Sequence, residues 1–119
     1  MAESPERHTT TEVGERCARG DQGLVRAFSV LGKRWSGLVI GTLMNGPTGF
    51  RELSRQVGGV SDSVLSDRLS ELCELGLATR SVDPGPPISV TYELTEAGYG
   101  LAPALREIAN WSDKFLLDD

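Results

Sequence analysis

The sequence of 119 residues predicts a single small α+β domain, mainly helical, with a β-hairpin directly after two short helices. Three observations support this prediction. Apolar residues repeat at helical spacing on both sides of Gly58-Gly59. Two segments of alternating polarity then flank a proline and glycine cluster. Finally, an apolar stripe at helical spacing runs toward the C-terminus.

The N-terminal third is expected to contain a polar arm and two helices. Residues 1–16 are polar, so we expect a mobile arm ahead of one domain over residues 17–119. The first helix carries an apolar stripe made of Leu24, Val25, Phe28 and Leu31. The second helix carries a stripe made of Trp35, Leu38, Val39 and Leu43. Gly46-Pro47 ends the second helix.

A third short helix is expected just before Gly58. Phe50, Leu53 and Val57 occur at positions i, i+3 and i+7, so they share one helical face. Gly58-Gly59 then interrupts the pattern, because glycine weakens a helix and permits positive φ. Arg51 and Arg55 are four residues apart, which places both on one side of this helix.

A fourth helix is expected to begin after Ser61, whose hydroxyl can cap it, with Asp62 in the favourable first turn. It should end at Gly76. Its inward face consists of Leu65, Leu69 and Leu72. Its outward face carries the short polar side chains of Ser63, Ser66, Asp67 and Ser70. Two short helices joined by a glycine turn are typical of a DNA-reading helix-turn-helix, and a slim polar face suits the major groove. An ordinary solvated surface is the alternative interpretation of that face.

A β-hairpin is predicted after Gly76. Val90, Tyr92 and Leu94 alternate with polar residues, as in a half-buried strand, and residues 77–83 form a weaker partner strand. The cluster at 84–87, Pro-Gly-Pro-Pro, forces a turn between them. A hairpin directly after the second helix of a helix-turn-helix is a wing, so the expected fold is a winged helix-turn-helix.

A last helix is expected after Thr95, which can cap it. Its apolar stripe consists of Leu101, Leu105, Ile108, Trp111 and Phe115. So long a stripe needs a partner surface. The helix around Leu24 to Leu31 can supply part of it, and a second copy of the chain can supply the rest, which predicts a homodimer.

In this order, the motifs resemble the HxlR family of bacterial winged helix-turn-helix transcriptional regulators, which is related to the MarR group. The resemblance extends from Cys17 to Phe115. It is carried by the segments 31–35, 46–53, 60–72, 76–77, 86–87 and 90–98, and by Trp111. It implies a dimeric repressor that binds a palindromic operator in double-stranded DNA. It also implies a response to an oxidant, an electrophile or a small-molecule effector.

The resemblance and the helical spacing together suggest which residues meet DNA. Arg51 and Arg55 are expected to contact phosphates, and Arg80, on the first strand of the wing, the DNA backbone or the minor groove. Arg68 either contacts phosphate or pairs with Glu71 or Glu52. Ser63, Ser66 and Asp67 are expected to affect which sequence is bound, and the capping residue Ser61 is also expected in the DNA-binding set. The sequence departs from the family at Asp62, Ser63 and Asp67, where larger amide or basic residues are common, and at Ile88, where a basic residue is common.

Cys17 occupies the position where the family typically has a cysteine, which in some members senses oxidants or electrophiles such as quinones and aldehydes. Here Ala18 follows it, where proline is usual. Arg16 and Arg19 favour the thiolate and Glu15 opposes it, so an unreactive thiol is the alternative interpretation. Cys73, near the end of the fourth helix, is expected to be a small packing residue.

Composition limits the remaining function classes. The net charge is −5, but the segment from Arg26 to Arg80 holds seven bases and five acids, so its centre is mildly basic. The sequence has no nucleophile elbow, phosphate loop or Cys-x-x-Cys, and we expect neither an enzyme nor a cofactor. His8 is its only histidine, and no metal site is expected.

The expected location and one competing function complete the predictions. The N-terminus lacks the apolar core of a signal peptide, and no apolar run is long enough to span a bilayer, so a cytoplasmic protein without membrane contact is expected. The alternative to a DNA-binding regulator is a winged-helix protein-interaction module without specific DNA binding. The acidic overall balance and the missing base at Ile88 favour that alternative.

Overall fold

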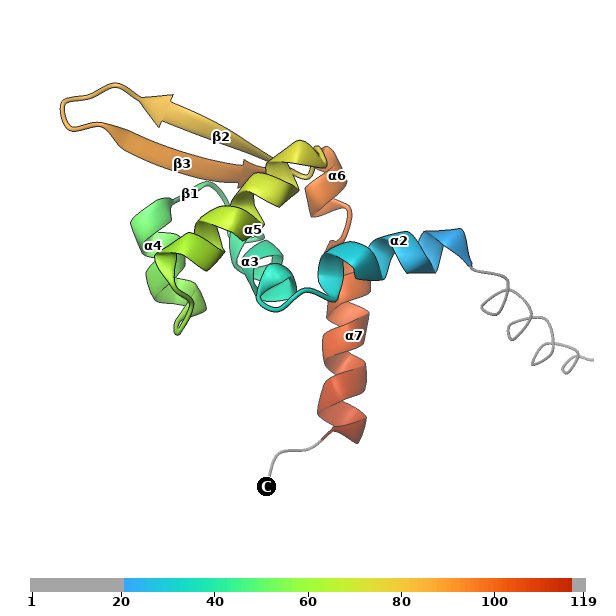
Figure 1. Cartoon of the computed structure of the whole chain (residues 1–119). Coiled ribbons are helices and arrows are strands. Elements are labelled where there is room, and N and C mark those ends of the chain that lie inside the picture. Colours follow the sequence, from blue (N-terminus) through green and yellow to red (C-terminus); the bar gives the residue numbers. More distant parts are fainter. Residues whose placement is uncertain (1–20, 117–119) are drawn as a thin grey trace, which may run out of the picture. The chain divides into compact units, whose positions relative to one another are not determined.

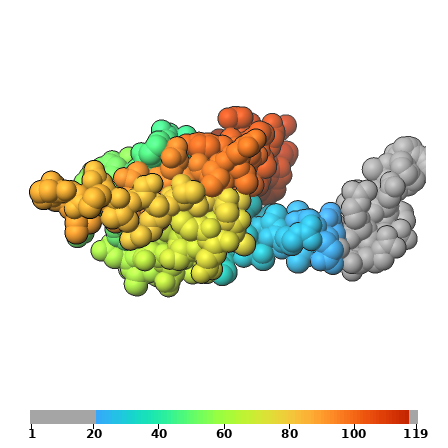
Figure 2. Space-filling model, turned by 90° about the horizontal axis from the view of Figure 1, so that it is seen from above, coloured from blue at the N-terminus to red at the C-terminus, as the bar shows by residue number. Residues whose placement is uncertain are grey.

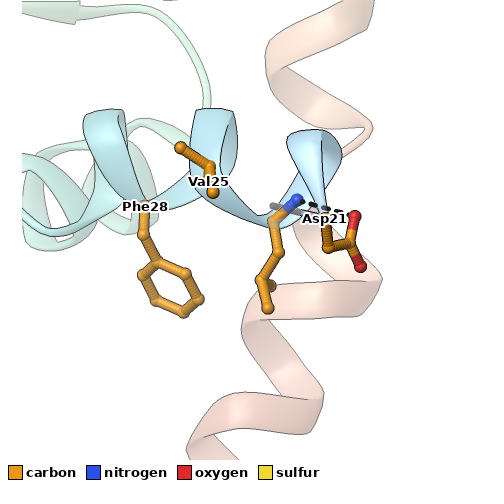
Figure 3. A pocket seen from close by; sticks show the side chains of 4 residues that line it. Asp21, Val25 and Phe28 are labelled. Atoms are coloured by element: carbon orange, nitrogen blue, oxygen red, sulfur yellow. Dashed lines mark hydrogen bonds between the residues drawn. The ribbon is translucent and has the colours of Figure 1, made fainter. Parts of the chain in front are cut away.

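The structure is a computed structural model that describes residues 21–116, and these belong to two units with a boundary after Arg34. In the first unit, α2 (Gln22–Leu31) begins where the Asp21 carboxylate accepts a hydrogen bond from the Leu24 amide at 3.3 Å. Asp21, Leu24, Val25 and Phe28 line a shallow hollow of about 240 Å³ (Figure 3). The predicted arm, His8 and Cys17 lie outside the described residues.

The second unit begins at Trp35 and contains all the remaining elements in the described part of the chain (Figure 1). Its helices are α3 (Ser36–Leu43), α4 (Phe50–Val57), α5 (Asp62–Glu74), α6 (Glu96–Tyr99) and α7 (Ala102–Phe115). Its strands are β1 (Thr48–Gly49), β2 (Ala78–Asp83) and β3 (Ser89–Leu94). Within the described residues, no helix is both long and apolar enough to cross a membrane.

The core of this unit is built from α3, α4, α5 and the sheet. Its fully buried side chains are Val39, Ile40, Leu43, Leu53, Leu65, Leu69 and Leu72. The predicted inward face of α5 is therefore confirmed. Of the predicted face of α4, Leu53 is buried, and Phe50 and Val57 are half-buried. The predicted stripe on α3 is partly wrong, because Leu38 is 58% exposed and Ile40 is buried in its place. Trp35 precedes α3 as its N-cap, with φ 81°, and is not part of the helix.

The strands form one antiparallel sheet in the order β1-β3-β2. The hairpin of β2 and β3 is the predicted wing, with Ala78 opposite Leu94 and Val82 opposite Val90. Figure 2 shows its tip, in orange, standing out from the rest of the unit. The edge strand β1 was not predicted, because two residues are too few to show an alternating pattern.

The C-terminal segment differs from the single helix that the sequence predicted. Thr95 caps only the short α6, where its Oγ accepts from the Gly98 amide at 3.2 Å and donates to the Gly76 carbonyl at 2.7 Å. The chain then starts a new helix at Ala102, with proline in its first turn. Proline is well tolerated there because the first amides of a helix have no intrahelical acceptor.

We expect Gly98→Ala to destabilise the domain by about 1–3 kcal/mol, because a Cβ there has no room. It would lie 2.2 Å from the Leu77 carbonyl oxygen, which is already held by the Thr95 amide at 3.0 Å. Urea unfolding followed by circular dichroism measures the change. Gly37→Ala is the matched control, since a Cβ at that helical glycine meets nothing within 4 Å. Equal stabilities of the two variants would contradict this packing argument.

Candidate nucleic-acid interface

The turn between α4 and α5 is made by two glycines in the left-handed region, with φ 74° at Gly58 and 81° at Gly59. Ser61 then caps α5, its Oγ accepting from the Val64 amide at 3.2 Å, and Asp62 lies in the first turn. Both interactions were predicted from the sequence. They satisfy a free amide and place a negative charge at the positive end of the helix, which fixes where α5 begins.

The other end of α5 is closed by a Schellman motif. Gly76 has φ 77°, and its amide donates to the Cys73 carbonyl at 3.0 Å. The Leu77 amide donates to the Leu72 carbonyl at 2.9 Å. With both ends closed, α5 is a well-defined helix of 13 residues that leads directly into the wing.

The outward face of α5 is polar and exposed, as the sequence predicted. Its side chains are those of Ser63, Ser66, Asp67 and Ser70, opposite the buried leucines. Ser61 Oγ lies 3.4 Å from Ser63 Oγ, so the capping residue is at the near end of the same face. A helix with such a slim surface can approach base edges in the major groove.

Arg51 and Arg55 are both exposed on α4, as expected. The structure adds an ion pair between Arg55 and Glu52, one helical turn away. The second oxygen of the same carboxylate accepts from Gln56 Nε2 at 2.7 Å. The positive charge of Arg55 is therefore partly neutralised by the Glu52 carboxylate. Arg51 lies near the start of the same short helix. The spacing of three residues between Glu52 and Arg55, which allows this ion pair on a helix, was visible in the sequence.

We expect Glu52→Gln to raise affinity for duplex DNA about two- to fivefold, because it releases Arg55 and removes one negative charge near the phosphates. Fluorescence anisotropy with a labelled duplex measures this change. The increase should shrink markedly when Glu52→Gln is combined with Arg55→Ala. If Glu52→Gln raises DNA affinity equally in wild type and in Arg55→Ala, its effect does not act through Arg55.

Arg68 forms the internal pair that was one of its two predicted alternatives. Its Nη2 donates to Glu71 at 3.4 Å, and its Nε lies 3.4 Å from the other carboxylate oxygen. The Arg68 side chain is only 19% exposed. Its contacts thus hold the flank of α5, while the more exposed Arg51, Arg55 and Arg80 remain accessible.

Arg80 comes together with α5 in a groove of about 510 Å³ between that helix and the wing. The groove is lined by Ser66, Ser70, Cys73, Glu74, Arg80 and Tyr92. Burial raises the pKa of the Cys73 thiol, and the positive charge of Arg80 partly offsets that rise. Cys73 is half-buried, consistent with a packing residue. Sequence reasoning missed this groove, because only the hairpin's position over α5 brings Arg80 to Ser66 and Ser70.

A second groove of about 340 Å³ lies where α4 begins beside β3. Its lining is formed by Gly49, Phe50, Arg51, Glu52, Ile88, Ser89 and Val90. Arg51 is thereby placed next to the start of β3, toward the tip of the wing. Each of the two grooves is lined by one arginine and one glutamate.

The predicted stripe on the last helix is exposed over most of its length. Ile108, Trp111 and Phe115 of α7 are all exposed, and Leu101 and Leu105 are half-buried. The rings of Trp111 and Phe115 lie 6.2 Å apart, and Lys114 Nζ lies 5.3 Å from the Phe115 ring. Contiguous apolar surface of this kind marks an interaction site.

Comparison with known proteins gives one consistent answer. A model of the HxlR-like helix-turn-helix family matches residues 30–119. The transcriptional regulator YodB of Bacillus subtilis (strain 168) is 43% identical over 89 residues, covering 75% of this chain and 80% of YodB. The uncharacterized regulator YvaP of the same organism is 37% identical over 102 residues, covering 86% of this chain and 91% of YvaP.

Solved structures agree with this result. The reduced form of YodB from B. subtilis superposes with a TM-score of 0.71 at 41% identity, covering 78% of this chain and 91% of that one. The redox regulator HypR in its oxidized form superposes with a TM-score of 0.73 at 27% identity, covering 82% and 98%. The chain therefore belongs to the HxlR-like helix-turn-helix family of DNA-binding transcriptional regulators.

Proposed function

We propose that two copies of this chain form a repressor that binds a two-fold symmetric operator, with α5 of each copy in a major groove. The main support for the proposal is the structure of α5. It is capped at both ends, buried along its leucines, and polar and exposed along Ser63, Ser66 and Ser70. A helix fixed in this way presents the same few side chains to every site it meets.

The proposed contacts divide into those that position the protein and those that read sequence. Arg51, Arg55 and Arg80 bind phosphates, which strengthens binding to any duplex. Ser63, Ser66 and Asp67 face bases, and the Asp67 carboxylate suits the N4 amino group of cytosine. Ser61 contributes mainly by capping α5, and Arg68 by bracing its flank against Glu71.

The proposed dimer forms through the apolar face of α7. This face consists of Leu101, Leu105, Ile108, Trp111 and Phe115. A second copy removes its exposed part from water, which drives association. A dimer also suits the operator, because two recognition helices must meet major grooves about 34–36 Å apart.

We further propose that Cys17 makes the repressor responsive to oxidants or electrophiles. Solved structures of YodB are described as reduced, diamide-treated and quinone-bound, and HypR is described as a redox regulator. Those states belong to those proteins. Here, Arg16 and Arg19 beside Cys17 favour its reactive thiolate and Glu15 opposes it, whereas burial raises the pKa of the Cys73 thiol.

We expect treatment with a quinone or diamide to weaken operator binding by wild type and by Cys73→Ser, but not by Cys17→Ser. If a modification of Cys17 changes how the two copies associate, it alters the spacing of the two α5 helices without touching DNA. Gel-shift titration with promoter DNA before and after treatment measures the affinity. An unchanged wild type, or an equal loss in Cys17→Ser, would rule out this sensor and favour a small-molecule effector.

A further inference from the structure

The side chain and backbone of Thr95 tie the end of α5 to the start of α6. The Thr95 hydroxyl donates to the Gly76 carbonyl at 2.7 Å, and its amide donates to the Leu77 carbonyl at 3.0 Å. Both acceptors closely follow α5, but Thr95 comes 19 residues after Gly76, on the far side of the wing. We call these two hydrogen bonds the Thr95 clasp, because they join segments that the chain itself connects only through the whole hairpin.

The same hydroxyl also begins α6, since it accepts from the Gly98 amide at 3.2 Å. Gly98 is buried and lies so close to the Leu77 carbonyl oxygen that a Cβ would have no room there. The Thr95 hydroxyl therefore has two separate roles. As an acceptor it caps α6, and as a donor it holds the C-terminal end of α5 against α6.

A short, hydrogen-bonded turn continues from α6 to α7. Only Gly100 and Leu101 lie between the two helices. The Gly100 amide donates to the Glu96 carbonyl at 2.9 Å, and the Leu101 amide donates to the Gly98 carbonyl at 3.1 Å. A path of hydrogen bonds thus leads from the end of α5 through the Thr95 clasp and α6 to the start of α7 (Figure 1). The apolar face of α7 is the proposed dimer contact.

We infer that Thr95 is a positioning residue for operator recognition, because its donated hydrogen bond fixes the angle between α5 and α7. In the dimer this angle sets the spacing of the two α5 helices. The inference rests on the proposed function, since the spacing matters only when two copies bind one operator. The two helices must match a fixed groove repeat, so a change of angle in each copy adds to that in the other.

The test uses the full-length protein and a two-fold duplex that wild type selects from a random-sequence library. A half-site duplex and a duplex with the half-sites moved apart by one base pair are compared with it. Thr95→Ala keeps the backbone hydrogen bond to Leu77, but it should lower affinity for the two-fold duplex about tenfold. Its affinity for the half-site duplex should stay within about twofold of wild type. Its preference for the selected spacing should fall at least about threefold.

Two further variants separate the clasp from the helix cap. Thr95→Ser retains the hydroxyl and should restore both the affinity and the spacing preference. Thr95→Asp can still cap α6, but a carboxylate cannot donate to the Gly76 carbonyl, so it should behave like Thr95→Ala on DNA. It also replaces Thr95→Ala in the comparison if that variant does not fold in urea titrations.

The matched control is Thr42→Ala, which removes a similar hydrogen bond, from the Thr42 hydroxyl to the Leu38 carbonyl at 2.8 Å within α3. It should keep the wild-type spacing preference. If Thr95→Asp also keeps that preference, Thr95 is only a helix cap and the inference is wrong. Equal losses on the half-site and two-fold duplexes would overturn it too, while the proposed function stands. If wild type selects no two-fold site, the proposed function itself fails, and the inference with it.

Discussion

Replacing Arg51, Arg55 and Arg80 together by alanine should lower the affinity for duplex DNA about a hundredfold at about 0.15 M salt. Each phosphate contact releases counterions and changes the salt slope by about 0.9, so the six contacts of two copies change it by about 5. Arg51 and Arg80 should account for most of the loss, because Arg55 also pairs with Glu52. Anisotropy titrations at several salt concentrations measure both affinity and slope.

The matched control for this loss is Arg106→Ala, which removes one positive charge from the exposed surface of α7. It should change the salt slope far less than Arg51→Ala or Arg80→Ala. An unchanged affinity and slope in the triple variant would show that these arginines do not meet phosphate. Equal effects of Arg106→Ala and Arg51→Ala would mean that only the total charge matters.

Trp111→Glu should convert the dimer to a monomer, with dimer association weakened at least about a hundredfold. The Trp111 side chain is 53% exposed in the isolated chain and belongs to the apolar face of α7. A carboxylate placed in such an interface loses its hydration without gaining a partner. Sedimentation at micromolar concentration should give twice the chain mass for wild type and one chain mass for the variant.

Asn110→Glu is the control, because it adds the same charge on the opposite side of the helix. It should remain dimeric and bind DNA. Trp111→Glu should lose operator binding along with its partner, since one α5 alone makes half of the contacts. A wild type that sediments as a monomer would contradict the dimer, and so would a Trp111→Glu variant that remains a dimer.

Local sequence signals predicted the helix-turn-helix well. The caps at Ser61 and Gly76, the glycine turn and the leucines of α5 are each set by residues within one or two helical turns. The wing was predictable for a similar reason, because its alternation and its turn residues lie close together in the sequence. These elements carry most of the proposed DNA interface.

The missed features depend on contacts between distant segments or on short, ambiguous patterns. Leu38 was expected inside, but α3 is apolar on nearly every side, so its spacing does not identify the buried face. Both grooves arise only when the hairpin lies over α4 and α5, which places Arg80 beside Ser70 and Ile88 beside Arg51. The sequence left two alternatives for Arg68, a phosphate contact or an internal ion pair. In the structure Arg68 pairs with Glu71.

The most direct test of the central claim is hydroxyl-radical footprinting of the selected duplex, combined with the mass of the protein–DNA complex. Two chains per duplex are expected. Two equivalent protected regions related by two-fold symmetry are also expected, with half-site centres about 10 base pairs or a multiple of that apart. One chain per duplex with a single protected region would contradict the account, and so would protection without any two-fold symmetry.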